Sequence, residues 1–155
     1  MREYHAGQLI AQDDGTLERL VGDGLLGVFN DPLPLSDHTE SAVRMALDMR
    51  GCIAGLANEW SARGHDLGFE VGISRGAETL GSIGFERCAE YSAFGTVPNL
   101  EARLCEASKA GPILVSRRVF SAVERLVEAT PMDLTFKGFA RPMAADDLVR
   151  LSGSA

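Results

Sequence analysis

The stretch ERLVGDGLLGVFND, residues 18–31, decides how the first part of the chain folds. Two apolar runs flank a Gly-Asp-Gly turn signal, which predicts strands over 16–21 and 25–29 joined by a tight hairpin turn. Asp23 then sits at the tip. Because Asp-Gly suits such turns, Asp23 is in one interpretation a plain turn residue. In the other it is a Mg²⁺ ligand, and the glycines let phosphates approach the backbone.

The patterns around this hairpin predict an α+β fold with an antiparallel component. Asp37 and Glu40 fit a capping box at the start of a helix whose apolar residues recur from Ala42 to Trp60 at three- and four-residue steps. The expected order begins helix, strand, strand, helix, strand, strand, and strands that come in consecutive pairs make a doubly wound dinucleotide fold a poor match. Further elements are expected as a helix at 1–12, strands within 67–76 and 78–85, a helix at 97–109, a strand at 112–116, a helix at 117–126, and strands within 132–139 and 146–151.

Composition limits the classes of protein to which the chain can belong. Its 155 residues suit one domain, residues 1–155, and 45% hydrophobic content indicates a globular chain. A net charge of −7 argues against nucleic-acid or anionic-membrane binding. No apolar run approaches the roughly 20 residues that span a bilayer. The three cysteines lack a CxxC spacing and the three histidines lack metal-ligand spacing, so we expect reduced thiols, a cytoplasmic location and no zinc site.

Two further stretches carry candidate functional residues. In EYSAFGTVPNLEARLC, residues 90–105, Asn99 and Arg103 are four residues apart and share a helix face. An amide and a guanidinium near a helix start suit an anion, although a solvated face would show the same spacing. In LTFKGF, Lys137 ends a predicted strand, and solvated surface is its default interpretation.

Taken together and in order, these segments resemble the catalytic domain of the class III adenylate and guanylate cyclases. The matching segments are GTLERLVGDGLLGVFNDP, DHTESAVRMALDMR, LGFEVGISRGAETLGSIGFE, YSAFGTVPNLEARL, GPILVS and FKGF, which together span nearly the whole chain. The resemblance implies a ferredoxin-like α/β sandwich that dimerises head to tail with sites at the interface. It also implies formation of cyclic AMP or cyclic GMP from ATP or GTP, with release of pyrophosphate, in cyclic-nucleotide signalling.

The resemblance assigns expected roles to single residues. Asp23 matches one of two metal-binding aspartates, which implies Mg²⁺ or Mn²⁺, two ions per site. Asn99 and Arg103 match the pair that orients the ribose and stabilises the transition state, and Lys137 matches a lysine that contacts the phosphates. Two metals would activate the attacking 3′-hydroxyl and neutralise the triphosphate.

Two residues fall where the family selects the purine base, Arg19 and Ser92. Adenylate cyclases usually carry Lys with Asp or Thr at these positions, and guanylate cyclases carry Glu with Cys or a similar residue. The pair here matches neither pattern. Arginine donates hydrogen bonds and serine both donates and accepts them, which favours ATP weakly and leaves GTP open.

The other metal aspartate of the family lies in an upstream segment like F-x-D-x-x-G-F-[ST], for which this chain has no match. We therefore expect a cyclase sandwich that lacks its first strand. Three interpretations follow: a nucleotidyl cyclase, a non-catalytic module that dimerises and binds nucleotide, or a subunit that completes a site with an intact cyclase partner as a heterodimer. The last would use Asn99, Arg103 and Lys137.

Overall fold

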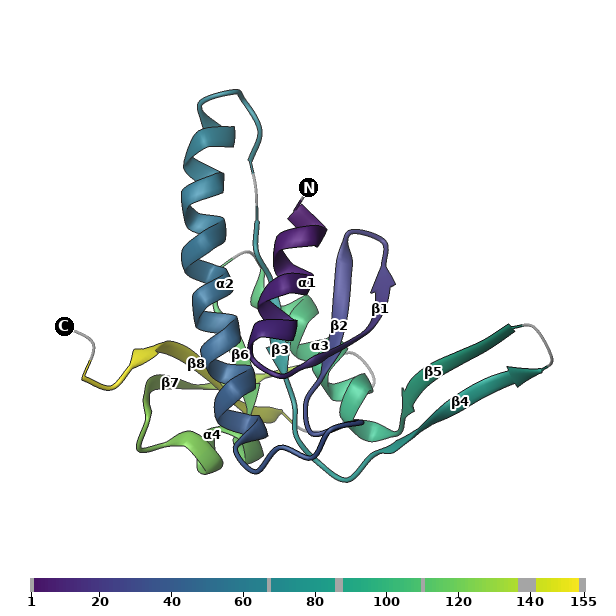
Figure 1. Cartoon of the computed structure of the whole chain (residues 1–155). Helices are drawn as coiled ribbons and strands as arrows, with labels where there is room; N and C mark the ends of the chain where they lie inside the picture. Colours follow the sequence, from purple (N-terminus) through teal and green to yellow (C-terminus); the bar gives the residue numbers. More distant parts are fainter. Residues whose placement is uncertain (1, 67, 86–87, 110, 137–141, 154–155) are drawn as a thin grey trace.

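The structure, a computed structural model, describes residues 2–66, 68–85, 88–109, 111–136 and 142–153 (Figure 1). It is an α+β fold of four helices and eight strands in these residues, as the sequence predicts. The helices are α1 (Arg2–Gln12), α2 (His38–Ser61), α3 (Thr96–Ser108) and α4 (Arg117–Val123). The strands are β1 (Thr16–Val21), β2 (Gly24–Val28), β3 (Val71–Ile73), β4 (Thr79–Phe85), β5 (Cys88–Phe94), β6 (Ile113–Ser116), β7 (Val127–Leu134) and β8 (Met143–Leu151).

The predicted hairpin at the start of the chain is confirmed. Strands β1 and β2 pair antiparallel and leave a two-residue turn of Gly22 and Asp23. Gly22 has a φ of +62°, which glycine adopts without strain. The pairing shifts register between Leu17 and Arg19, and this bulge leaves Glu18 outside the regular ladder.

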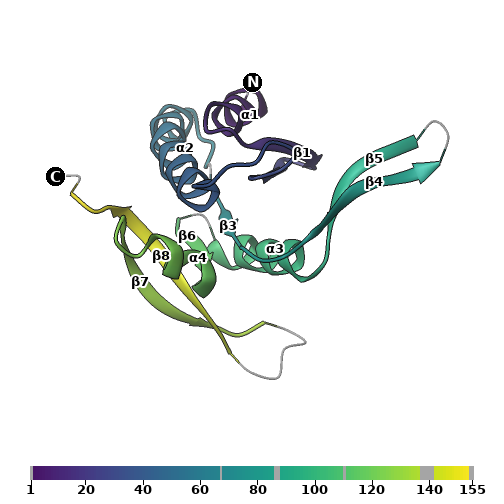
Figure 2. The same cartoon turned by 60° about the horizontal axis from the view of Figure 1, so that its bottom comes forward.

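The core lies between α2 and a four-stranded mixed sheet of order β3-β6-β8-β7, in which β3 and β6 run parallel. Strand β6 is buried at every residue, which explains its unbroken apolar sequence. The hairpin β1–β2 packs on α1 beside this core, where Ile10 is buried (Figure 2). Among the described residues no helix is long and apolar enough to cross a membrane.

Helix α2 departs from expectation at both ends. Asp37 is the N-cap, but its side chain makes no capping hydrogen bond, so the predicted capping box is wrong. Its other member, Glu40, instead pairs with Arg44 one turn on, at 2.6 Å. The apolar stripe is buried as far as Met49 and then becomes half-buried or exposed, because the second half of the helix extends past the sheet (Figure 1).

Strand β5 is an element that the sequence analysis omitted. It pairs with β4 over seven residues, from Thr79 opposite Phe94 to Phe85 opposite Cys88. Together they form a long two-stranded hairpin that projects away from the body of the molecule (Figures 1 and 2). The sequence CAEYSAF contains alanine and glutamate, which are poor strand formers, and it lacks strict alternation.

Candidate active site

Glu18 connects the first hairpin to the projecting hairpin. Its side chain is only 1% exposed, and its Oε1 accepts a hydrogen bond from the Ser92 hydroxyl at 2.7 Å. The same oxygen accepts from the Ala93 backbone N–H at 3.1 Å and from Arg19 Nη2 at 2.9 Å. The bulge in β1 therefore turns a carboxylate inward, where it ties β1 to β5.

The two residues predicted to select the base, Arg19 and Ser92, lie in direct contact. Arg19 Nη2 donates to Ser92 Oγ at 2.6 Å, and that hydroxyl in turn donates to Glu18. The second carboxylate oxygen, Glu18 Oε2, is buried and has no hydrogen-bond partner in the described part of the chain. Glu18 Oε2 is closed off from a ligand, whereas the Arg19 side chain is 43% exposed. Arg19 is therefore the group of this cluster that can donate to an acceptor on a purine edge.

A second carboxyl group, Glu101 on α3, faces the same region. Burial raises the pKa of Glu101 to about 7, and the nearby Glu18 carboxylate adds to the shift. The sequence analysis missed both glutamates, although each leaves a signal. Glu18 and Arg19 are consecutive charges in an apolar strand, so one of them must face inward. Glu101 occupies the helical stripe that contains Leu104.

The predicted transition-state pair lies on the exposed side of α3. Asn99 Nδ2 donates to the carbonyl oxygen of Gly95 at 3.0 Å, at the start of the helix. Arg103 Nη1 lies 3.0 Å from Glu106 Oε2, with the two side chains 49% and 72% exposed. Exposed pairs of this kind contribute about 0–1 kcal/mol, so the guanidinium can leave Glu106 at little cost. The two residues share the helix, as predicted, but each has a local partner.

Asp23 is exposed at the hairpin turn and makes no hydrogen bond or ion pair with any described residue. The described residues also contain no group of three His, Cys, Asp or Glu side chains placed to hold a metal. Mg²⁺ is typically held by one or two carboxylates together with substrate phosphates, so Asp23 can supply one ligand of such a site. Lys137, predicted to contact the phosphates, lies outside the described residues.

Replacing Glu101 with glutamine is expected to stabilise the chain at pH 8 and to change little at pH 5. The pKa of Glu101 is about 7 when folded and about 4.5 when unfolded, so the folded chain binds more protons between these values. The contribution of Glu101 to the free energy of unfolding therefore falls as the pH rises from about 4.5 to about 7, and it stays lost at higher pH. We expect a gain of about 1–3 kcal/mol at pH 8 from thermal unfolding at both pH values. Glu124→Gln, an exposed control on another element, is expected to show no such difference.

Comparison with known proteins places these features in one family. The family model for the adenylate and guanylate cyclase catalytic domain matches residues 6–139. Adenylate cyclase 1 of Rhizobium meliloti (strain 1021) is 28% identical over 142 residues, which cover 90% of this chain and 21% of that protein. The chain thus spans about a fifth of the length of the curated relatives it matches.

Solved structures show the same fold. The adenylyl cyclase CyaB from P. aeruginosa superposes with a TM-score of 0.89 at 29% identity, covering 96% of this chain and 78% of that one. The guanylate cyclase domain of RhGC from Catenaria anguillulae, solved in complex with GTP, superposes with a TM-score of 0.85 at 23% identity, covering 97% and 80%. The predicted fold class is therefore confirmed, and the chain belongs to the adenylate and guanylate cyclase catalytic domain family.

Proposed function

We propose that the chain acts as a nucleotidyl cyclase domain that converts ATP or GTP to the 3′,5′-cyclic nucleotide and pyrophosphate. The observation that carries this proposal is the hydrogen-bonded cluster of Glu18, Arg19 and Ser92. It joins the Gly-Asp-Gly hairpin to the strand that leads into α3, and in it Arg19, which we propose selects the base together with Ser92, donates to the Ser92 hydroxyl. The role that we propose for the chain is the formation of a cyclic-nucleotide second messenger in the cytoplasm.

The chain's own residues would position the nucleotide and stabilise charge. Arg19 and Ser92 would hold the purine edge, while Asn99 would orient the ribose near the start of α3. Arg103 would exchange its surface partner Glu106 for the charge that develops on the phosphate, where a guanidinium is more effective than in water. Lys137 would contact the phosphates.

Asp23 would hold Mg²⁺ or Mn²⁺ together with the phosphates of the nucleotide. When bound, the metal supplies charge neutralisation and makes the 3′-hydroxyl a better nucleophile. The exposed position of Asp23 at a turn whose other residue is glycine leaves room for such a complex. The described residues offer no three-ligand set. We therefore propose a homodimer, or a heterodimer with another cyclase domain, whose interface completes the site.

The test is a cyclic-nucleotide assay on the purified chain with ATP and GTP separately, in Mn²⁺, alone and mixed with a cyclase domain of the family that has been made inactive by replacing its own transition-state arginine. We expect product that depends on Arg103 of this chain, with a loss of at least about 100-fold in Arg103→Ala. The nucleotide that is converted to product, ATP or GTP, identifies the purine base that the site accepts. Activity of the mixture that Arg103→Ala leaves unchanged would contradict the proposed role of this chain.

A second candidate function is a non-catalytic module that dimerises and binds nucleotide. Its supporting observation is that Arg103 is paired with Glu106 and that the described residues contain no group of three His, Cys, Asp or Glu side chains placed to hold a metal. This candidate predicts that a folded chain binds ATP or GTP with no product in either form of the assay. Isothermal titration with each nucleotide, run on the same samples, separates the two functions.

A further inference from the structure

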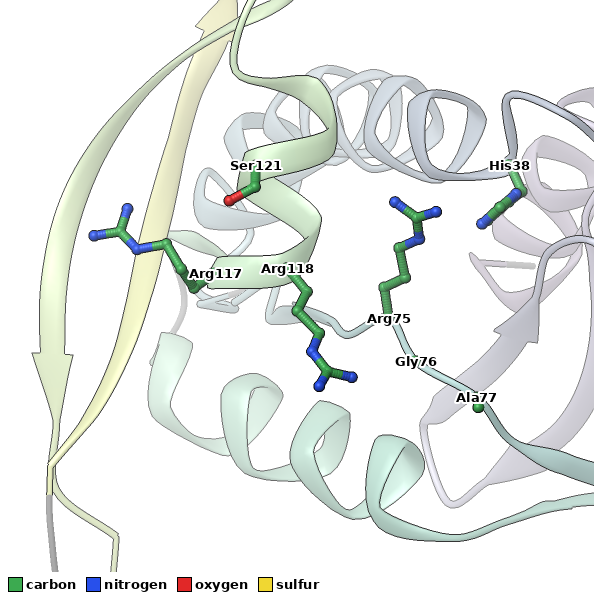
Figure 3. A pocket seen from close by; sticks show the side chains of 7 residues that line it. All are labelled: His38, Arg75, Gly76, Ala77, Arg117, Arg118 and Ser121. Carbon is green, nitrogen blue, oxygen red and sulfur yellow. The ribbon is translucent and has the colours of Figure 1, made fainter.

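A cavity of about 560 Å³ lies between the start of α2, the loop after β3, and α4 (Figure 3). Its lining includes Arg75, Arg117, Arg118 and His38, and none of the described residues that line it is acidic. The whole chain has a net charge of −7, so this concentration of positive charge runs against its composition. A local basic cavity on an acidic protein attracts anions selectively to that point.

The three arginines differ in how their charge is balanced. Arg117 pairs with Asp146 at 2.7 Å, a carboxylate whose side chain is only 2% exposed, and it points away from Arg75 (Figure 3). Arg75 and Arg118 make no hydrogen bond or ion pair with any described residue. A guanidinium does not lose its proton at any ordinary pH, so these two charges persist and a bound anion would neutralise them.

The two unpaired arginines approach the cavity from different elements. Arg75 lies in the loop after β3, and its guanidinium points toward His38 at the start of α2 (Figure 3). Arg118 extends from α4 and reaches the same loop, since its Nη1 lies 3.5 Å from where a Cβ on Gly76 would be. His38 Nδ1 donates to the Leu35 carbonyl at 3.0 Å, so Nε2 of a neutral ring is an acceptor and does not donate to an anion.

None of the described candidate active-site residues lines this cavity, although its loop contacts the first turn of α3, where Ser74 Oγ donates to the Val97 carbonyl at 2.7 Å. The turn of the β1–β2 hairpin lies in the upper half of Figure 1, whereas the start of α2 and helix α4 lie near the bottom. None of the residues that line the cavity takes part in the cluster of Glu18, Arg19 and Ser92. An anion bound here would therefore occupy a second site on the same domain.

We propose that this cavity binds a small phosphate-bearing molecule, with pyrophosphate or an organic phosphate as its chemical class. Guanidinium groups match phosphate oxygens with paired hydrogen bonds. The donors for such a group are the guanidiniums of Arg75 and Arg118, which come from different elements and point in opposite directions in Figure 3, so at least one of them rotates on binding. The cavity volume falls within the roughly 300–1,000 Å³ typical of small-molecule sites, so the cavity has room for pyrophosphate or for a phosphate that carries an organic group. The proposal rests on no part of the nucleotide site.

Isothermal titration of the full chain with inorganic pyrophosphate, in EDTA and low salt, tests the proposal. We expect one site with a dissociation constant below 1 mM. Arg75→Ala and Arg118→Ala should each weaken binding at least about tenfold, which corresponds to about 1.4 kcal/mol. Both side chains are exposed and unpaired among the described residues, so the variants should keep the wild-type melting temperature. Titration with inorganic phosphate then shows whether one phosphoryl group suffices.

Two control variants locate the binding. Arg63→Ala removes the same charge from an exposed position just past the far end of α2 and should leave the affinity unchanged. Arg103→Ala removes an arginine of the candidate active site and should also leave it unchanged. A loss of affinity in Arg103→Ala with none in Arg75→Ala would place pyrophosphate in the nucleotide site and overturn the proposal. Equal affinity in all four variants, or none in the wild type, would overturn it as well.

Discussion

Replacing Asp23 with asparagine is expected to remove at least about 100-fold of the cyclic-nucleotide-forming activity of the chain. Asparagine keeps the turn preference of aspartate but loses the negative charge that a divalent cation requires. A metal that acts as a Lewis acid contributes several kcal/mol to such a reaction, and each 1.4 kcal/mol is tenfold in rate. The measurement is the initial rate in Mn²⁺ for wild type, Asp23→Asn and Asp23→Ala.

The asparagine variant distinguishes the two interpretations of the turn. A residue that only shapes the turn would let Asp23→Asn retain activity, and would let Asp23→Ala lose stability. A metal ligand predicts that both variants are inactive and that both melt near the wild-type temperature, because Asp23 makes no hydrogen bond or ion pair with any described residue. Asp133→Ala, an exposed aspartate on β7, removes the same charge elsewhere and should keep full activity.

Replacing Gly72 with alanine is expected to lower the melting temperature by roughly 10 °C and to reduce any activity with it. Strand β3 lies so close to α3 that a Cβ at Gly72 would be 2.4 Å from the Glu101 carbonyl oxygen and 2.5 Å from the Cys105 nitrogen. These are backbone atoms of a helix, which cannot rotate away. Overpacking of this kind costs about 1–3 kcal/mol, and we expect the upper end of that range.

The effect on activity follows from what the displaced helix carries. Helix α3 holds both Asn99 and Arg103, so a shift of its axis moves the two together relative to the first hairpin. The matched control is Gly51→Ala in the exposed part of α2, where a Cβ would meet nothing within 4 Å. Alanine is the better helix former, so this variant should gain about 0.5–1 kcal/mol. Thermal unfolding of both proteins that shows equal stability for Gly72→Ala and wild type would contradict the close packing.

Local sequence signals predicted the elements that carry their own start and stop residues. The turn at Gly22 and Asp23 and the apolar stripe of α2 through Met49 are examples, because each depends on backbone preference or on periodic burial. Strand β5 has no such local signal and was not predicted. Its residues form a strand through pairing with β4, and a pairing partner leaves no mark on local periodicity.

In the candidate site too, some residues could be identified from the sequence, whereas their contacts could not. The positions of Arg19 and Ser92 followed from the family resemblance, but their hydrogen bond depends on a bulge at Glu18, and register shifts are not visible in a single sequence. The inward turn of Glu18 and the burial of Glu101 depend on how β1, β5 and α3 meet. That meeting is a tertiary property, so only the structure shows two carboxyl groups close enough for one to raise the pKa of the other.

The projecting hairpin of β4 and β5 has a mechanical consequence. Ser92 and Ala93 belong to this hairpin, and both are tied to the body through one carboxylate, that of Glu18. The long hairpin is held near its base, so a movement along its length is transmitted to Ser92, the residue in it that would touch the purine. A displacement of this hairpin would therefore shift Ser92 relative to both Glu18 and Arg19.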